Sequence, residues 1–144
     1  MSFLFLTSCT VSPRYNTKSS VSNLSKNSKK TYKKNSSNTN KLRGISSWYG
    51  PNFHGKLTAN GEVYDMYGTT AAHKTLPLNT IVRVTNLENG KSIILKINDR
   101  GPYVGDRILD CSFGAAKKLG FDNQGTTSVE IDIIEMGDDV YMHH

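Results

Sequence analysis

The sequence has few cysteines and no long apolar run. Only two cysteines occur in 144 residues, Cys9 and Cys111, and they lie far apart. The even, clustered set of cysteines that marks a secreted disulfide framework is therefore missing. Cys111 is expected to be a small buried apolar residue. No stretch reaches the roughly 20 apolar residues of a transmembrane helix, and the length suits one ordinary domain.

Acidic residues are absent from the first part of the chain. Residues 1–43 contain seven lysines, two arginines and no aspartate or glutamate, whereas residues 44–144 contain nine basic and twelve acidic residues. The pI of about 9.3 therefore reflects the N-terminal segment. Because the candidate domain has no basic excess, we do not expect a nucleic-acid-binding protein.

Residues 10–43 are built mostly from Ser, Asn, Thr and Lys. Such a segment cannot bury enough apolar surface to offset the entropy of ordering it. We therefore expect a disordered basic linker. It can serve as a tether without a specific partner, or its lysines can bind an anionic membrane or wall polymer.

The first nine residues resemble a lipoprotein signal. An apolar patch, Phe3 to Leu6, is followed by Thr7, Ser8 and Cys9, and the cysteine would become the lipidated N-terminus. The apolar stretch is shorter than the usual roughly 7–15 residues and no positive region precedes it. We therefore interpret residues 1–9 as a degenerate or truncated signal.

From Gly44 onward, β-branched and alternating apolar residues predict strands over 45–49, 69–72, 80–85, 91–97 and 129–133. Residues 52–67 are rich in glycine, asparagine and aromatics and predict a loop. Asn89-Gly90 predicts a hairpin with a type I′ turn. Ser112 and Gly120 are expected to cap a helix over 113–119.

These elements predict a small, mostly β barrel over residues 44–136, with one short helix and a disordered linker before it. The acidic tail, 137–144, is expected to fray. Within the barrel, the apolar run from Ile93 to Ile97 ends at Asn98-Asp99-Arg100-Gly101-Pro102. This end is either a plain turn or a rigid strand that delivers Asp99 to the rim of a cleft.

Two further segments favour the cleft interpretation. Glu62 and Asp99 could form two carboxylates of one cleft, and His73 could bond one of them and set its protonation. The alternatives are a solvated turn glutamate and a structural histidine. Aromatic residues concentrate near Glu62, where they suit the C–H faces of sugar rings. His54 and His73 lack partners at metal-ligand spacing, so we expect no metal site.

Several motifs, in order, resemble the rare lipoprotein A (RlpA) family. The matching blocks cover about residues 44–135 and include Ser47-Trp48-Tyr49-Gly50, Phe53-His54-Gly55, Thr58-Ala59-Asn60-Gly61-Glu62, Thr70-Ala71-Ala72-His73-Lys74, Asn98-Asp99-Arg100-Gly101-Pro102 and Arg107-Ile108-Leu109-Asp110. The resemblance implies a six-stranded double-psi β-barrel, a fold also found in expansins. It further implies a periplasmic lipoprotein, lipid-anchored through Cys9 to a membrane.

The implied activity is that of a lytic transglycosylase. Such an enzyme cleaves peptidoglycan between N-acetylmuramic acid and N-acetylglucosamine and leaves 1,6-anhydro ends, without a cofactor. The alternatives are a non-catalytic wall-binding or division-associated lipoprotein and a related glycan hydrolase. Many relatives carry a SPOR domain after the barrel, and no such domain is expected here.

Transferred to this sequence, the family's catalytic acid/base is Asp99, with Glu62 and His73 as the other active-site residues. We expect Arg100 to point away from Asp99, and Asp110 to lie outside the constellation. Residues expected to contact the glycan are Trp48, Tyr49, Phe53, His54, Asn60, Tyr64 and Arg100.

Overall fold

The computed structural model describes residues 41–144. These residues form six strands, one α-helix and one short 3₁₀ helix. In chain order they are β1 (Leu42–Trp48), η1 (Pro51–Phe53), β2 (Thr70–His73), β3 (Ile81–Asn86), β4 (Ser92–Asp99), β5 (Arg107–Cys111), α1 (Phe113–Leu119) and β6 (Thr126–Glu135).

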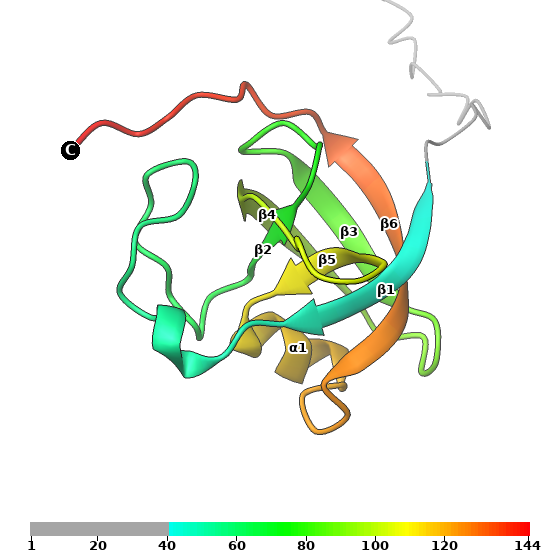
Figure 1. The fold of residues 1–144 in the computed structure, drawn as a ribbon. Helices are drawn as coiled ribbons and strands as arrows, with labels where there is room; N and C mark the ends of the chain where they lie inside the picture. The colour runs from blue at the N-terminus through cyan, green and yellow to red at the C-terminus, as the bar shows by residue number, and fades with distance from the viewer. Residues whose placement is uncertain (1–40) are drawn as a thin grey trace, which may run out of the picture. The chain divides into compact units, whose positions relative to one another are not determined.

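The strands close into a barrel in the order β1-β5-β2-β4-β3-β6 (Figure 1). Strands β1 and β5 pair in parallel, as do β2 and β4, and the other four pairs are antiparallel. The predicted six-stranded barrel with one short helix is confirmed. The expected signal, with Cys9, lies outside the described residues, as does the expected linker up to residue 40.

The parallel pair of β2 and β4 contains one irregularity next to the end of β4. Ala71 pairs with Ile97, but the next residue of β2, Ala72, pairs with Asp99. Asn98 is therefore an extra residue in β4, a β-bulge. Because side chains alternate along a strand, this bulge turns Asp99 to the same face as Ala72.

The other parallel pair, β1 and β5, contains a matching irregularity. Ile45 pairs with Arg107 and the next residue, Ser46, pairs with Leu109, so Ile108 is the extra residue. Bulges are uncommon in parallel pairs and frequent beside functional sites. The barrel thus has one bulge in each of its two parallel pairs.

The core is formed by alternating residues of the strands and by one face of α1. All of its members are apolar and buried. They include Ala71, Val82, Val84, Leu95, Ile97, Leu109, Cys111, Ala115, Ala116, Leu119, Phe121, Val129 and Ile131. The prediction that Cys111 is a small buried residue is confirmed, and its burial raises the thiol pKa to about 12.

Helix α1 has the predicted caps. The Ser112 hydroxyl accepts a hydrogen bond from Ala115 N, and Gly120 closes the helix in the left-handed region with φ 76°. No helix in residues 41–144 has the length and hydrophobicity to cross a membrane.

Gly114 lets α1 approach the loop that precedes β2. Its amide donates to Met66 O at 2.7 Å. A Cβ at this position would lie 2.3 Å from Tyr67 O, so no other residue fits without movement. This contact fastens the 52–69 region to the helix.

Four details differ from the sequence prediction. The hairpin between β3 and β4 has a five-residue loop, and only Gly90 in it has a positive φ. The predicted type I′ turn is therefore wrong, because it requires a positive φ at both central residues. Strand β5 was not predicted, because its five residues include two polar ones, Arg107 and Asp110.

The first strand begins at Leu42, before the expected boundary at Gly44. Lys41 precedes this strand and Arg43 is its second residue. Both side chains bind the carboxylate of Glu130 on β6, Lys41 at 2.7 Å and Arg43 at 2.6 Å. These ion pairs extend the pairing of β1 and β6 into the segment expected to be linker.

The C-terminal tail also differs from expectation. Leu78 N donates to Asp139 Oδ1 at 2.8 Å, and Asp139 N donates to Leu78 O at 3.1 Å. Met142 N donates to Asn60 O at 2.6 Å. The expectation of a frayed tail is corrected by these contacts, which pair its backbone with two loops of the barrel.

Replacing Gly114 by alanine tests the close approach of α1 to Tyr67. The Cβ would overlap Tyr67 O, so we expect Gly114→Ala to lower the free energy of unfolding by about 1–3 kcal/mol. Urea denaturation of purified protein measures the change. Gly50→Ala is the matched control, since a Cβ there meets nothing within 4 Å. Equal stability of the two variants would contradict the packing described here.

Candidate functional site

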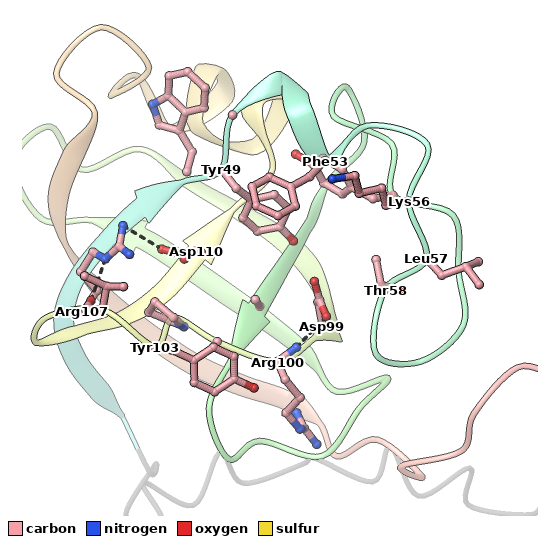
Figure 2. A pocket seen from close by; sticks show the side chains of 17 residues that line it. Tyr49, Phe53, Lys56, Leu57, Thr58, Asp99, Arg100, Tyr103, Arg107 and Asp110 are labelled. Carbon is pink, nitrogen blue, oxygen red and sulfur yellow. Dashed lines mark hydrogen bonds and ion pairs between the residues drawn. The ribbon is translucent and has the colours of Figure 1, made fainter.

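A pocket of about 450 Å³ opens at the ends of β1, β4 and β5 (Figure 2). Its volume falls in the range of roughly 300–1,000 Å³ that is usual for small-molecule sites. The lining combines aromatic rings with charged groups of both signs. The aromatic residues are Trp48, Tyr49, Phe53, Tyr64 and Tyr103, and the charged residues are Lys56, Asp99, Arg100, Arg107 and Asp110.

Asp99, the predicted acid/base, lines this pocket at the last residue of β4. Its Oδ1 accepts hydrogen bonds from Ala59 N and Arg100 N, both at 2.9 Å. Within residues 41–144 no hydrogen bond reaches its Oδ2. One oxygen is thus fixed by the backbone, and the other is available to a bound ligand.

Glu62 does not line the pocket, but it holds the bulge that orients Asp99. Its carboxylate binds Lys96 Nζ and accepts a hydrogen bond from Asn98 Nδ2 at 2.9 Å. Desolvation alone would raise the pKa of Glu62, but the hydrogen bonds from Lys96 and Asn98 outweigh it and lower that pKa. Glu62 and Asp99 therefore flank the same strand end and do not face each other across the pocket.

His73 also lies outside the pocket lining. Its side chain is buried, and its Nδ1 accepts hydrogen bonds from Thr75 N at 3.1 Å and Leu76 N at 3.0 Å. Among the described residues it makes no hydrogen bond with a carboxylate, so that part of the prediction is wrong. Burial, and then the charges of Arg100 and Lys74, lower the pKa of His73. It holds the turn after β2.

Arg100 lines the pocket with part of its side chain, but its guanidinium turns away from Asp99. One terminal nitrogen donates to Leu76 O at 2.7 Å, and the other binds Asp139 Oδ1 at 3.0 Å. The expectation that Arg100 points away from Asp99 is confirmed. Its charge supports the turn that His73 also holds.

Tyr49 places a buried hydroxyl at the pocket. Its ring packs against Tyr64 at 4.6 Å and Phe53 at 5.9 Å between centroids. Its hydroxyl is buried and has no hydrogen-bond partner among residues 41–144. Burial, and then the negative charge of Asp99, raise the pKa of Tyr49 well above its usual range. The Tyr49 phenol is therefore neutral, and its hydroxyl can donate a hydrogen bond to a ligand bound in the pocket.

The other predicted binding residues divide into two groups. Trp48, Phe53 and Tyr64 line the pocket with Tyr49, whereas His54 and Asn60 do not. His54 accepts from Met66 N. Asn60 is fully buried and organises the turn before Glu62.

Asp110 was expected to lie outside the constellation, and this is wrong, because its side chain lines the pocket together with Asp99 (Figure 2). Leu109 and Cys111, on either side of it, are fully buried. Alternation therefore turns Asp110 to the opposite face. That pattern in the sequence could have identified Asp110 if β5 had been recognised as a strand.

Metal coordination finds no support in residues 41–144. No group of three or more histidine, cysteine, aspartate or glutamate side chains in this range could hold a metal ion.

The family described as lytic transglycolase (DPBB_1) matches residues 41–131. Curated relatives are named endolytic peptidoglycan transglycosylase RlpA. The relative from Pseudomonas aeruginosa is 57% identical over 104 residues, which cover 72% of this chain and 30% of the relative. That from Neisseria meningitidis is 60% identical over 94 residues, which cover 65% and 39%. The chain thus spans about a third of the length of these relatives.

Solved structures with a similar fold have much lower sequence identity. The Streptomyces papain inhibitor matches with a TM-score of 0.54 and 21% identity, over 66% of this chain and 94% of its own. An expansin from Clavibacter michiganensis matches with a TM-score of 0.54 and 15% identity, over 66% of this chain and 50% of its own. These likenesses concern the fold alone.

Burial of His73 predicts a pH-dependent stability. The pKa of His73 is lower in the folded protein than in the unfolded chain. As the pH falls through about 6.5, the unfolded chain therefore binds more protons than the folded protein does. Acidification from pH 7.5 to 5.5 should therefore destabilise the fold. His73→Asn keeps an acceptor without a titrating ring, so thermal unfolding of this variant should depend less on pH. An identical pH dependence in both proteins would contradict the assignment.

Proposed function

The chain belongs to the lytic transglycolase family of double-psi β-barrel domains, and on this premise we propose that its barrel cleaves the glycan strands of peptidoglycan as a lytic transglycosylase. The observation that carries the proposal is the placement of Asp99. Its carboxylate lines an aromatic pocket, and within residues 41–144 the backbone engages one of its two oxygens. The names of the curated relatives support the same activity.

In the proposed reaction, protonated Asp99 gives its proton to the glycosidic oxygen that links N-acetylmuramic acid to N-acetylglucosamine. The bond between that oxygen and the anomeric carbon breaks, and its electron pair stays with the oxygen. The 6-hydroxyl oxygen of N-acetylmuramic acid bonds to the anomeric carbon and returns a proton to Asp99. The product carries a 1,6-anhydro ring and no water is consumed, so one acid/base residue suffices.

The geometry of Asp99 suits this role. Because Ala59 N and Arg100 N both bind Oδ1, Oδ2 is the oxygen that can carry the transferred proton. A proton donor must lie within hydrogen-bond reach of the atom it protonates. A carboxylate fixed at the end of a strand meets that requirement without reorganisation.

Aromatic rings around Asp99 would hold the glycan. Phe53 is about half exposed and Tyr103 is 80% exposed, and both lie at the same pocket as the ring of Tyr49. Aromatic rings present a flat apolar face to a ligand, and tyrosine adds a polar end. In this proposal sugar rings pack on the exposed faces of Phe53 and Tyr103, and the hydroxyl of the half-buried Tyr49 donates to a sugar oxygen.

Glu62 and His73 act in this proposal as positioning residues. Glu62 binds Asn98, the bulged residue directly before Asp99. His73 accepts from the turn at Thr75 and Leu76, and Arg100 donates to Leu76 O. Loss of either residue would therefore alter the orientation of Asp99.

Exchange of Asp99 for asparagine tests the reaction. Asp99→Asn keeps the size of the side chain and its acceptor oxygen but removes the titrating proton. We expect release of 1,6-anhydro products from purified sacculi to fall by about 10²–10⁴-fold, the usual contribution of a general acid/base, while binding to sacculi remains. Mass spectrometry of the soluble products measures the outcome.

Asp132→Asn is the matched control, because Asp132 lies on β6 opposite Arg83 and outside the pocket lining. Asp99→Asn with the product yield of the wild type would refute the assignment. A wild-type protein that binds sacculi and forms neither anhydro nor reducing ends is a non-catalytic wall binder, and one that forms reducing ends is a hydrolase.

We also propose that Cys9 is lipidated and holds the barrel at a membrane of the bacterial cell envelope, facing the periplasm. The support is the sequence Leu6-Thr7-Ser8-Cys9 and the peptidoglycan substrate named for the relatives. Cys9→Ser should move the protein from the membrane fraction to the soluble periplasmic fraction. Unchanged fractionation, with no acyl mass on the wild-type cysteine, would rule out the anchor.

A further inference from the structure

Four neighbouring strands place one residue each in a row, and three of the four residues line the pocket. Ser47 on β1 pairs with Asp110 on β5, Asp110 pairs with Ala72 on β2, and Ala72 pairs with Asp99 on β4. Residues that pair directly across strands point to the same face of a sheet. The row therefore reads serine, aspartate, alanine, aspartate, with all four side chains on the pocket face.

The two aspartates of this row are separated by one residue with a minimal side chain. Adjacent strands lie about 4.8 Å apart, so the backbones of Asp99 and Asp110 lie about 10 Å apart. On the strand between them, the row holds the small side chain of Ala72, so a ligand can lie against both carboxylates.

Asp110 is held in place by two neighbours. The Ser47 hydroxyl donates to Asp110 Oδ1, and the Arg107 guanidinium forms an ion pair with the same oxygen at 3.5 Å. Arg107 also donates to the Ser47 hydroxyl. The Asp110 side chain is only 16% exposed, so the carboxylate has a fixed position and solvent screens its charge poorly. The Arg107 guanidinium offsets this charge in part, because the same nitrogen also donates to the Ser47 hydroxyl.

The environment of Tyr49 supports the convergence of both carboxylates. After burial, the charge of Asp99 is the largest cause of its raised pKa, and the charge of Asp110 adds to it. Tyr49 lines the same pocket as both carboxylates. Within the described residues its hydroxyl bonds to neither.

We propose that Asp110 is a second catalytic carboxylate, a fixed anion that faces the anomeric carbon of N-acetylmuramic acid while Asp99 protonates the glycosidic oxygen. This inference rests on the proposed glycan cleavage, and it gives Asp110 a role in the same pocket that differs from the role of Asp99. Asp110 neither gives nor takes a proton and forms no bond. Asp99 supplies the proton to the leaving oxygen, and the 6-hydroxyl closes on the anomeric carbon as described above.

The need for such an anion follows from the chemistry of the bond. Glycoside cleavage passes through a transition state in which the anomeric carbon and ring oxygen carry positive charge. A preorganised opposite charge in a partly dry pocket stabilises that state more than the ground state. Asp99 enters the reaction protonated and neutral, so it does not supply this charge at the start of bond cleavage. Asp110 does, from the other side of Ala72.

A binding experiment tests the charge directly and does not depend on turnover. The probes are a protonated iminosugar analogue of N-acetylmuramic acid and its neutral lactam counterpart, and calorimetry measures both affinities. The wild type should prefer the cation by at least about tenfold. In Asp110→Asn this preference should fall about tenfold, whereas in Asp110→Glu, which keeps the charge, and in Asp132→Asn it should persist. If Asp110→Asn does not fold, Asp110→Ser replaces it in this binding experiment, since its hydroxyl can still form a hydrogen bond with Ser47.

Turnover on sacculi provides the second measurement. Asp110→Asn should lower the rate of anhydro-product release by about 10²–10³-fold, the size of a lost electrostatic stabiliser. Its binding to sacculi and its melting temperature should stay close to those of the wild type. The product should still carry the 1,6-anhydro ring, because Asp110 activates no water.

The outcomes separate this inference from the proposed function. If Asp99→Asn abolishes cleavage while Asp110→Asn retains both the cleavage rate and the preference for the cation, the proposed function stands and the role of Asp110 is overturned. If the wild type does not cleave glycan but prefers the cation through Asp110, the proposed function fails and the anionic site stands. Reducing ends that require Asp110 would make it a base for water and overturn its role as a passive anion.

Discussion

One extra residue in strand β4 determines where the Asp99 side chain points. In a regular pairing of β2 with β4, the residue opposite Ala72 would be Asn98, and Asp99 would turn to the other face. Because Asn98 is bulged, Asp99 pairs with Ala72 and faces the pocket. A bulge leaves a residue unpaired in the ladder and must be supported from outside it. The candidate site depends on that support.

The support comes from the turn that contains Glu62. Asn60 N donates to Asn98 O at 3.1 Å, and Glu62 accepts from the Asn98 side chain at 2.9 Å. The same turn supplies Ala59 N to Asp99 Oδ1. Loop and strand are thus joined by three hydrogen bonds around the bulge. Glu62 therefore stabilises the backbone that presents Asp99, and it does so without facing the substrate pocket.

Much of this arrangement could be predicted from the sequence, because it depends on local patterns. Ser112 and Gly120 mark the ends of α1, and the apolar run before Asp99 marks β4 and its end. The bulge could not be predicted, because regular alternation would place Ile97 and Asp99 on the same face of β4. Their pairing with neighbouring residues of β2, Ala71 and Ala72, shows that they face opposite sides. Strand β5 was missed for a similar reason, because its polar residues face a pocket that only the closed barrel creates.

The electrostatics of the site follow from the direction that each arginine takes. Arg100 is adjacent to Asp99 in the sequence, yet its guanidinium binds Leu76 O and Asp139, so it does not neutralise the carboxylate. Arg107 instead pairs with Asp110. The two carboxylates of the pocket thus differ in their partners, backbone amides for one and a guanidinium for the other. Different surroundings allow two chemically identical groups to take different roles in one reaction. The parallel pair β1–β5 carries Asp110, and the parallel pair β2–β4 carries Asp99. The two pairs meet between β5 and β2, so the two carboxylates with different partners lie on either side of Ala72.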